Sequence, residues 1–171
     1  VREREGIRGA SLRYFNASGA HPDGSMGEAH NPETHLIPLA LQARLGQRGP
    51  LSLFGRDYDT RDGTCIRDYI HVCDLAVAHR LALGSLWEGH SGRAWNLGTG
   101  TGTTVLEVLE SIERITGKAV PFVDADRREG DPPGLYAAAQ QVKSDLGWSP
   151  ERASIDQIVS DAWSWIQNAR Y

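Results

Sequence analysis

Arginine and aspartate residues whose positions suit a phosphate-bearing ligand occur in two separate segments of the chain. Arg67 and Asp68 lie in a run of β-branched and aromatic residues, and Arg128 lies three residues before Asp131. A guanidinium is a planar, permanently charged donor that suits phosphate, and a carboxylate accepts hydrogen bonds from sugar hydroxyls. Together the segments indicate an anionic, hydroxyl-rich ligand such as a nucleotide sugar. Each segment also has a plainer interpretation, as charges at a strand edge or on a solvated loop.

Two further motifs are compatible with such a ligand. Residues 98–102, Gly-Thr-Gly-Thr-Gly, lie between a predicted strand and a predicted helix, which is the context of a phosphate- or ribose-binding loop. Thr103 stands where a dinucleotide fingerprint has its third glycine, so a tight turn is the favoured interpretation. Tyr14, Phe15 and Asn16 end a predicted strand, where they either line a ligand or simply pack.

Composition excludes several other classes of function. The 171 residues are 40% hydrophobic and 23% charged, which suits one ordinary packed domain. The net charge of −4 argues against a nucleic-acid partner, and no apolar run is long enough to cross a membrane. Cys65 and Cys73 have neither zinc nor redox spacing, so we expect reduced thiols in a cytoplasmic protein. The six histidines are scattered, and we expect no metal site.

Short strands that alternate with helices position these residues. Hydrophobic patterning predicts strands over residues 10–15, 51–54, 66–72, 93–97 and 119–123. It predicts helices over residues 35–45, 75–86, 104–115, 137–146 and 154–169. A capping box at Thr104 and Glu107 opens the third helix, and long polar loops are expected over 16–34, 55–64 and 124–134. The alternation predicts an α/β or α+β protein.

Five motifs, taken in this order, closely resemble the UDP-glucose 4-epimerase family of the extended short-chain dehydrogenase/reductase superfamily. They are Leu12-Arg13-Tyr14-Phe15-Asn16, Phe54-Gly55-x-Asp57-Tyr58, Arg67-Asp68-Tyr69-Ile70-His71-Val72-x-Asp74, Asn96-Leu97-Gly98-x-Gly100-x-Gly102 and Arg127-Arg128-x-Gly130-Asp131. The resemblance implies an α/β fold: the C-terminal part of an NAD(P)-binding Rossmann-fold epimerase, with its last Rossmann strands and the smaller α/β substrate-binding lobe. Residues 1–171 would be that C-terminal portion, and the N-terminal NAD-binding part would lie outside them.

The resemblance also implies an isomerase activity. The family interconverts UDP-galactose and UDP-glucose in galactose metabolism, through a 4-keto sugar, with bound NAD and a catalytic Tyr-x-x-x-Lys motif. No tyrosine of this chain is followed by lysine four residues later. The chain is therefore expected to supply the UDP-sugar site, to hold no catalytic residue and to be inactive alone. The complete enzyme would be a cytoplasmic homodimer without nucleic-acid or membrane partners.

The resemblance assigns binding roles to particular residues. Tyr14 would lie near the nicotinamide of NAD. Around the nucleotide it implies His35, Leu36, Ser52, Leu53, Phe54 and Val105. Around the diphosphate and the two sugars it implies Phe15, Asn16, Arg67, Tyr69, Arg128 and Asp131. In these roles Arg67 and Arg128 would clamp the diphosphate, and Asp131 would hold the ribose hydroxyls.

One departure from the family leaves other activities open. Leu135 stands where several relatives carry a bulky tyrosine beside the hexose, and a smaller residue could admit an N-acetyl group. A UDP-N-acetylglucosamine 4-epimerase is therefore an alternative. A related nucleotide-sugar dehydratase or decarboxylase is a separate alternative. A non-catalytic module that binds nucleotide sugars is the alternative of another class.

Overall fold

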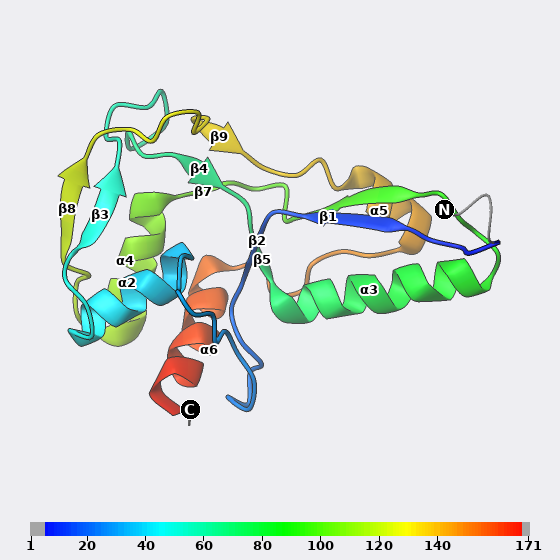
Figure 1. Cartoon of the computed structure of the whole chain (residues 1–171), viewed down its shortest axis with the longest axis horizontal. Coiled ribbons are helices and arrows are strands. Elements are labelled where there is room, and N and C mark those ends of the chain that lie inside the picture. Colours follow the sequence, from blue (N-terminus) through cyan, green and yellow to red (C-terminus); the bar gives the residue numbers. More distant parts are fainter. Residues whose placement is uncertain (1–5, 169–171) are drawn as a thin grey trace.

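The computed structural model describes residues 6–168 and arranges them as two groups of elements along the longest axis of the molecule (Figure 1). In the first group, β1 (Ser11–Tyr14) pairs in parallel with β6 (Ala94–Leu97). The helices α3 (Val72–Trp87) and α5 (Gln140–Leu146) pack beside this pair. The core of the group contains Ile70, Leu75, Ala78, Ala82, Trp95, Leu97, Val142 and Trp148.

The second group packs three helices against another pair of parallel strands. The strand β3 (Leu51–Phe54) pairs with β8 (Phe122–Ala125). Beside them lie α2 (Leu36–Leu45), α4 (Val105–Thr116) and α6 (Ile155–Asn168), which contact one another. Their shared core includes Ile37, Leu41, Leu51, Val108, Ile112, Ile158 and Val159.

Five very short strands join the two groups. The strand β2 (Asn16–Ser18) pairs in parallel with β5 (Tyr69–His71). The strand β4 (Ile66–Arg67) lies between β7 (Thr103–Thr104), which is antiparallel to it, and β9 (Gly134–Leu135), which is parallel. The α/β class predicted from the sequence is confirmed, with parallel pairing in four of the five strand pairs that these residues form.

Local signals place several helix ends where the sequence predicts them. Gly46 and Gly117 end α2 and α4 in the left-handed conformation, with φ values of 73° and 70°. Thr104 and Glu107 form the predicted capping box, in which each side chain accepts a hydrogen bond from the other residue's backbone N–H.

Three predicted boundaries are wrong, and long-range pairing explains each of them. The strand predicted over 66–72 is interrupted at Asp68, and the helix after it begins at Val72. The strand predicted over 119–123 is shifted to β8 because it follows the register of β3. The helix predicted over 137–146 begins only at Gln140, because the backbone N–H of Ala137 donates to the Asp68 carboxylate.

Two other predictions need smaller corrections. The loop predicted over 16–34 starts with β2, which the partner strand β5 induces. The last predicted helix, over 154–169, is α6, and its final predicted residue, Ala169, lies outside the described residues.

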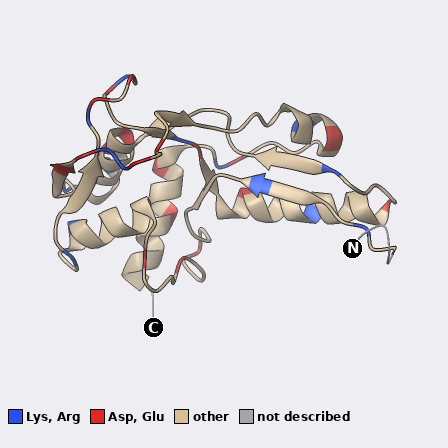
Figure 2. Cartoon of the chain, turned by 45° about the horizontal axis from the view of Figure 1, so that its top comes forward, with Lys and Arg blue, Asp and Glu red and all other residues tan. Residues whose placement is uncertain are grey.

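Charged residues of both signs are interspersed along the chain, including the loops that follow β3 and β8 (Figure 2). Within residues 6–168, no helix combines the length and the apolarity that crossing a membrane requires.

A buried histidine ties the strand β5 to the helix α6. His71 has no solvent exposure, and its Nδ1 accepts the backbone N–H of Cys73 at 3.0 Å. The proton of the neutral ring therefore sits on Nε2, which donates to Asp161 at 3.1 Å. Burial lowers the pKa of His71, and the hydrogen bond to Asp161 opposes that shift only in part. Arg152 also faces this carboxylate, at 3.5 Å.

We expect the midpoint of urea unfolding to fall as the pH drops from about 7.5 to about 5.5. Folding lowers the pKa of His71, so below its ordinary value of about 6.5 the unfolded chain binds more protons than the folded chain. The stabilisation from neutral His71 is complete above that pH and is lost progressively below it. Urea titrations at stepped pH measure the change.

Two variants separate this effect from general acid sensitivity. His71→Gln keeps a donor and an acceptor without a proton to gain, so its midpoint should depend less on pH over this interval. His90→Gln removes a histidine whose side chain is 66% exposed and should retain the parent's pH dependence. Equal pH dependence in His71→Gln and the parent protein would contradict the assignment.

Candidate functional site

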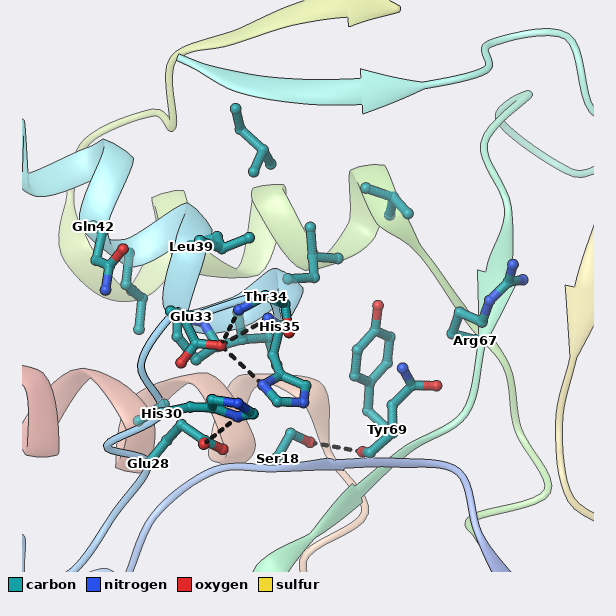
Figure 3. A pocket seen from close by; sticks show the side chains of 18 of the residues that line it. Ser18, Glu28, His30, Glu33, Thr34, His35, Leu39, Gln42, Arg67 and Tyr69 are labelled. Carbon is teal, nitrogen blue, oxygen red and sulfur yellow. Dashed lines mark hydrogen bonds and ion pairs between the residues drawn. The ribbon is translucent and has the colours of Figure 1, made fainter. Parts of the chain in front are cut away.

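A cavity of about 720 Å³ opens beside the short strands that join the two groups (Figure 3). Its volume lies in the range of small-molecule binding sites. Most of the residues that the family resemblance assigns to substrate binding line it: Asn16, His35, Leu36, Ser52, Leu53, Phe54, Arg67, Tyr69, Val105, Arg128 and Asp131. These residues come from separate strands, helices and loops, so folding brings them together.

Three predicted residues are not among those that line the cavity. The side chain of Tyr14 is about half exposed at the end of β1, and its ring lies 6.0 Å from that of His79. Phe15 is partly buried between β1 and β2. Leu135, in β9, is about half exposed and pairs in register with Arg67. The roles assigned to these three residues stay predictions.

The guanidinium of Arg67 is held in place at the cavity wall. Its Nη1 donates to the carbonyl oxygens of Ile66 at 2.6 Å and Pro132 at 3.1 Å, and its Nη2 forms an ion pair with Asp131. The side chain is only 12% exposed, so solvent screens this pair weakly. Two segments that are more than sixty residues apart in the sequence thus share one charged contact.

The adjacent arginines of the loop after β8 diverge. The guanidinium of Arg128 lies 4.0 Å from the ring centroid of Phe54, and both residues line the cavity. Arg127 instead pairs with Asp57, with Nε at 2.7 Å from the carboxylate, and stacks over Tyr58 at 4.3 Å. Of the two, only Arg128 is among the residues that line the cavity.

Asp68 points away from Arg67 into the protein and holds the glycine-rich turn. Its Oδ1 accepts the backbone N–H and the hydroxyl of Thr99, at 2.9 and 2.7 Å. Its Oδ2 accepts the backbone N–H groups of Gly100 at 3.0 Å and Ala137 at 3.1 Å. Two amides of the turn are thereby used inside the protein, which favours the tight-turn interpretation over a phosphate loop.

Two titratable side chains in the cavity wall are suited to packing rather than to proton transfer. Burial raises the pKa of the Tyr69 phenol well above its ordinary value. Burial also raises the pKa of the Cys65 thiol, and the nearby Arg67 opposes this only in part. Both groups stay protonated near neutral pH, so the cavity is suited to bind a ligand through arginines, carboxylates and apolar walls.

Sequence reasoning missed the contribution of α6 and of the loop before α2. Ala162, Trp165 and Ile166 line the cavity together with residues 28–31, 33 and 34. The indole Nε1 of Trp165 donates to the carbonyl oxygen of Glu28 at 2.8 Å, and its ring packs against Gly27 so closely that a Cβ there would overlap it. The amphipathic pattern of α6 predicts that tryptophans are buried, but it does not identify the loop against which they pack.

Known proteins resemble this chain over most of its length. The model of the NAD dependent epimerase/dehydratase family matches residues 1–98. The UDP-glucose 4-epimerase of Streptococcus mutans serotype c is 48% identical over 94% of this chain, and that of Azospirillum brasilense is 52% identical over 94%. The matches cover 48% and 46% of those two proteins, so the chain spans about half the length of the curated relatives.

Solved structures agree with the fold. The UDP-glucose 4-epimerase from Brucella ovis in complex with NAD has a TM-score of 0.91 at 48% identity, over 95% of this chain and 51% of its own. The enzyme from Bifidobacterium longum in complex with NAD⁺ and UDP has a TM-score of 0.86 at 38% identity, over 93% of this chain and 48% of its own. The expected partial Rossmann fold is confirmed by these likenesses.

Replacing Gly98 with alanine should destabilise the protein by about 1–3 kcal/mol, because the new methyl group would overlap the Asp68 carboxylate and Ala137. The matched control is Gly84→Ala on the exposed face of α3, where nothing lies within 4 Å of the added Cβ. That variant should be stabilised by about 0.5–1 kcal/mol, through helix propensity. Urea unfolding compares the two, and equal effects would disprove the close packing at Gly98.

Proposed function

The chain belongs to the NAD dependent epimerase/dehydratase family, and on this premise we propose that it forms the UDP-sugar-binding part of a UDP-glucose 4-epimerase. The single observation that carries the proposal is the convergence of the expected site residues from six separate segments on one cavity, with Arg67, Arg128 and Asp131 among its charged groups. The relatives named UDP-glucose 4-epimerase support the choice of substrate.

The cavity offers charged side chains that suit the diphosphate and ribose of a UDP-sugar and apolar side chains that suit its uracil. Arg67 and Arg128 would bind oxygens of the diphosphate, which are good bidentate partners for guanidinium groups. Asp131, held beside Arg67 by their ion pair, would accept hydrogen bonds from ribose hydroxyls. Leu53 and Phe54 would pack against the uracil, because both line the cavity from β3.

The reaction we propose interconverts UDP-galactose and UDP-glucose through a 4-keto sugar, a step of galactose metabolism. NAD supplies reversible hydride transfer in such chemistry. To this cofactor we assign Tyr14, whose half-exposed ring lies at the carboxyl end of the parallel strand β1, where ligands of open α/β sheets bind. The Tyr-x-x-x-Lys motif is absent from these 171 residues. The chain's own residues therefore bind and orient the substrate, and we expect no turnover by the chain alone.

A second activity is favoured by the position of Leu135. Its register with Arg67 sets it beside the wall of the cavity, and its side chain is smaller than an aromatic one. A UDP-Glc/GlcNAc 4-epimerase from Campylobacter jejuni has a TM-score of 0.81 with this chain at 36% identity. We propose that UDP-N-acetylhexosamines are accepted as well, and comparison of kcat/KM for UDP-galactose and its N-acetylated analogue measures this.

The assay uses the protein expressed from its complete reading frame, incubated with UDP-galactose and NAD. Formation of UDP-glucose supports the epimerase. A 4-keto-6-deoxy sugar nucleotide, or loss of carbon dioxide from a UDP-uronic acid, would instead identify a dehydratase or a decarboxylase. Binding of UDP without any turnover would identify a non-catalytic module.

Arg128→Ala should raise the KM for UDP-galactose about tenfold to a hundredfold, since one charge-assisted hydrogen bond contributes about 1.5–3 kcal/mol. Arg67→Ala should do the same. Arg127→Ala is the matched control. This neighbouring arginine is paired with Asp57 and, unlike Arg128, does not line the cavity. Its KM should stay within about twofold of the parent value.

Steady-state kinetics of the three variants measures these constants, and circular dichroism checks that each variant folds. Parent-like KM values in both Arg67→Ala and Arg128→Ala would refute the diphosphate clamp. A rise in KM that is equally large in Arg127→Ala would refute its specificity.

A further inference from the structure

Three metal-ligating side chains meet on the loop that precedes α2. Glu28, His30 and His35 each offer one ligand atom, and these atoms all lie within 4.8 Å of one another. The rings of His30 and His35 have centroids 5.3 Å apart, and the Nδ1 of His30 lies 3.8 Å from the Glu28 carboxylate. Figure 3 shows both rings side by side at the edge of the cavity.

A fourth side chain orients one of these ligands. Glu33 Oε1 accepts a hydrogen bond from His35 Nδ1 at 2.8 Å, and also from the backbone N–H groups of Thr34 and His35, each at 2.7 Å. Because this oxygen already accepts two backbone N–H groups, it acts as an acceptor toward the ring as well, so the proton lies on Nδ1 and the Nε2 lone pair of His35 is available.

This carboxylate–histidine pairing is the arrangement that metal-bound histidines adopt. The second ring nitrogen of such a histidine usually donates to a carboxylate, which fixes the tautomer and the direction of the ligating nitrogen. The Glu33 side chain is only 10% exposed, whereas those of Glu28, His30 and His35 are 37%, 49% and 48% exposed. The orienting group is therefore fixed, and the ligating groups are reachable from solvent.

The backbone under the ligands is anchored at both ends. Trp165 of α6 donates to the carbonyl oxygen of Glu28 and packs against Gly27, and His35 is the N-cap residue of α2. The ligand atoms of a tetrahedral zinc ion lie about 3.4 Å apart. The candidate ligand atoms here already lie within 4.8 Å of one another, so small side-chain rotations would bring them to that spacing. Anchoring lowers the entropy that metal binding would remove.

We propose that Glu28, His30 and His35 bind one divalent cation of the zinc class. Two imidazoles and one carboxylate form a His₂Glu set, which suits Zn²⁺ or Co²⁺ better than Ca²⁺ or Mg²⁺, both of which prefer oxygen ligands. Three protein ligands leave a fourth position for water or for a group of a ligand in the cavity, since all three residues line it.

The test titrates Zn²⁺ alone into the chelator-treated protein, expressed from its complete reading frame, by isothermal calorimetry. One equivalent of Zn²⁺ should bind, and Co²⁺ in its place should give the intense visible absorption of a tetrahedral ion. His30→Gln and His35→Gln should each weaken Zn²⁺ binding about tenfold or more. His30 is an exposed loop residue, so its variant keeps the test valid if His35→Gln fails to fold.

The matched control is His90→Gln. His90 lies 3.9 Å from Glu88, an exposed histidine–glutamate pair of nearly the same spacing, but outside the three-residue cluster. Its removal should leave the affinity for Zn²⁺ unchanged. The proposal is overturned if no stoichiometric binding occurs, or if His30→Gln binds Zn²⁺ as tightly as the parent protein. Because no sugar nucleotide is present, these outcomes are independent of the epimerase proposal.

Discussion

The carboxylate of Asp68 lies in the protein interior with no solvent exposure. The position of the cavity wall depends on the hydrogen bonds that this carboxylate accepts. A buried carboxylate is tolerated when it is well hydrogen-bonded, and Asp68 accepts four hydrogen bonds from Thr99, Gly100 and Ala137. These contacts interrupt what would otherwise be one strand. The interruption lets β4 join one small sheet and β5 another, so that the two groups of elements share a single continuous segment.

The same interruption separates the functions of two neighbouring residues. Arg67 lies before the break and turns toward the cavity, where Asp131 holds it, while Asp68 turns into the protein. The ion pair with Asp131 keeps the guanidinium ordered but also occupies part of it. An incoming anion therefore meets a pre-positioned arginine, yet it shares that arginine with a resident carboxylate, which weakens binding relative to an unpaired cation.

The sequence was sufficient where structure depends on neighbours within a few residues. The capping box at Thr104 and the left-handed glycine after α2 are local signals, and both appear as predicted. The sequence was insufficient where the local structure depends on a contact with a residue far away in the chain. Nothing near Asp68 in the sequence indicates that its carboxylate accepts hydrogen bonds from residues about thirty and seventy positions away. Likewise, the spacing of Glu28, His30 and His35 does not indicate that their side chains meet.

The family resemblance supplied what periodicity could not, because it carries information about contacts between distant segments. Most residues chosen in that way line one cavity, but the resemblance did not distinguish the ion-paired Arg67 from the stacked Arg128. Those states follow from the side chains that surround each arginine in this chain, and only the folded arrangement specifies them.

The packing of Trp165 against Gly27 links the cavity to the order in which the chain is made. The loop of residues 28–34 emerges from the ribosome well over a hundred residues before Trp165, the side chain that holds it. During synthesis this wall of the cavity therefore has no support from α6, and a ligand-binding shape can form only after that helix has been completed. A nascent chain interrupted before α6 would expose the loop and the apolar residues beneath it to chaperones and proteases.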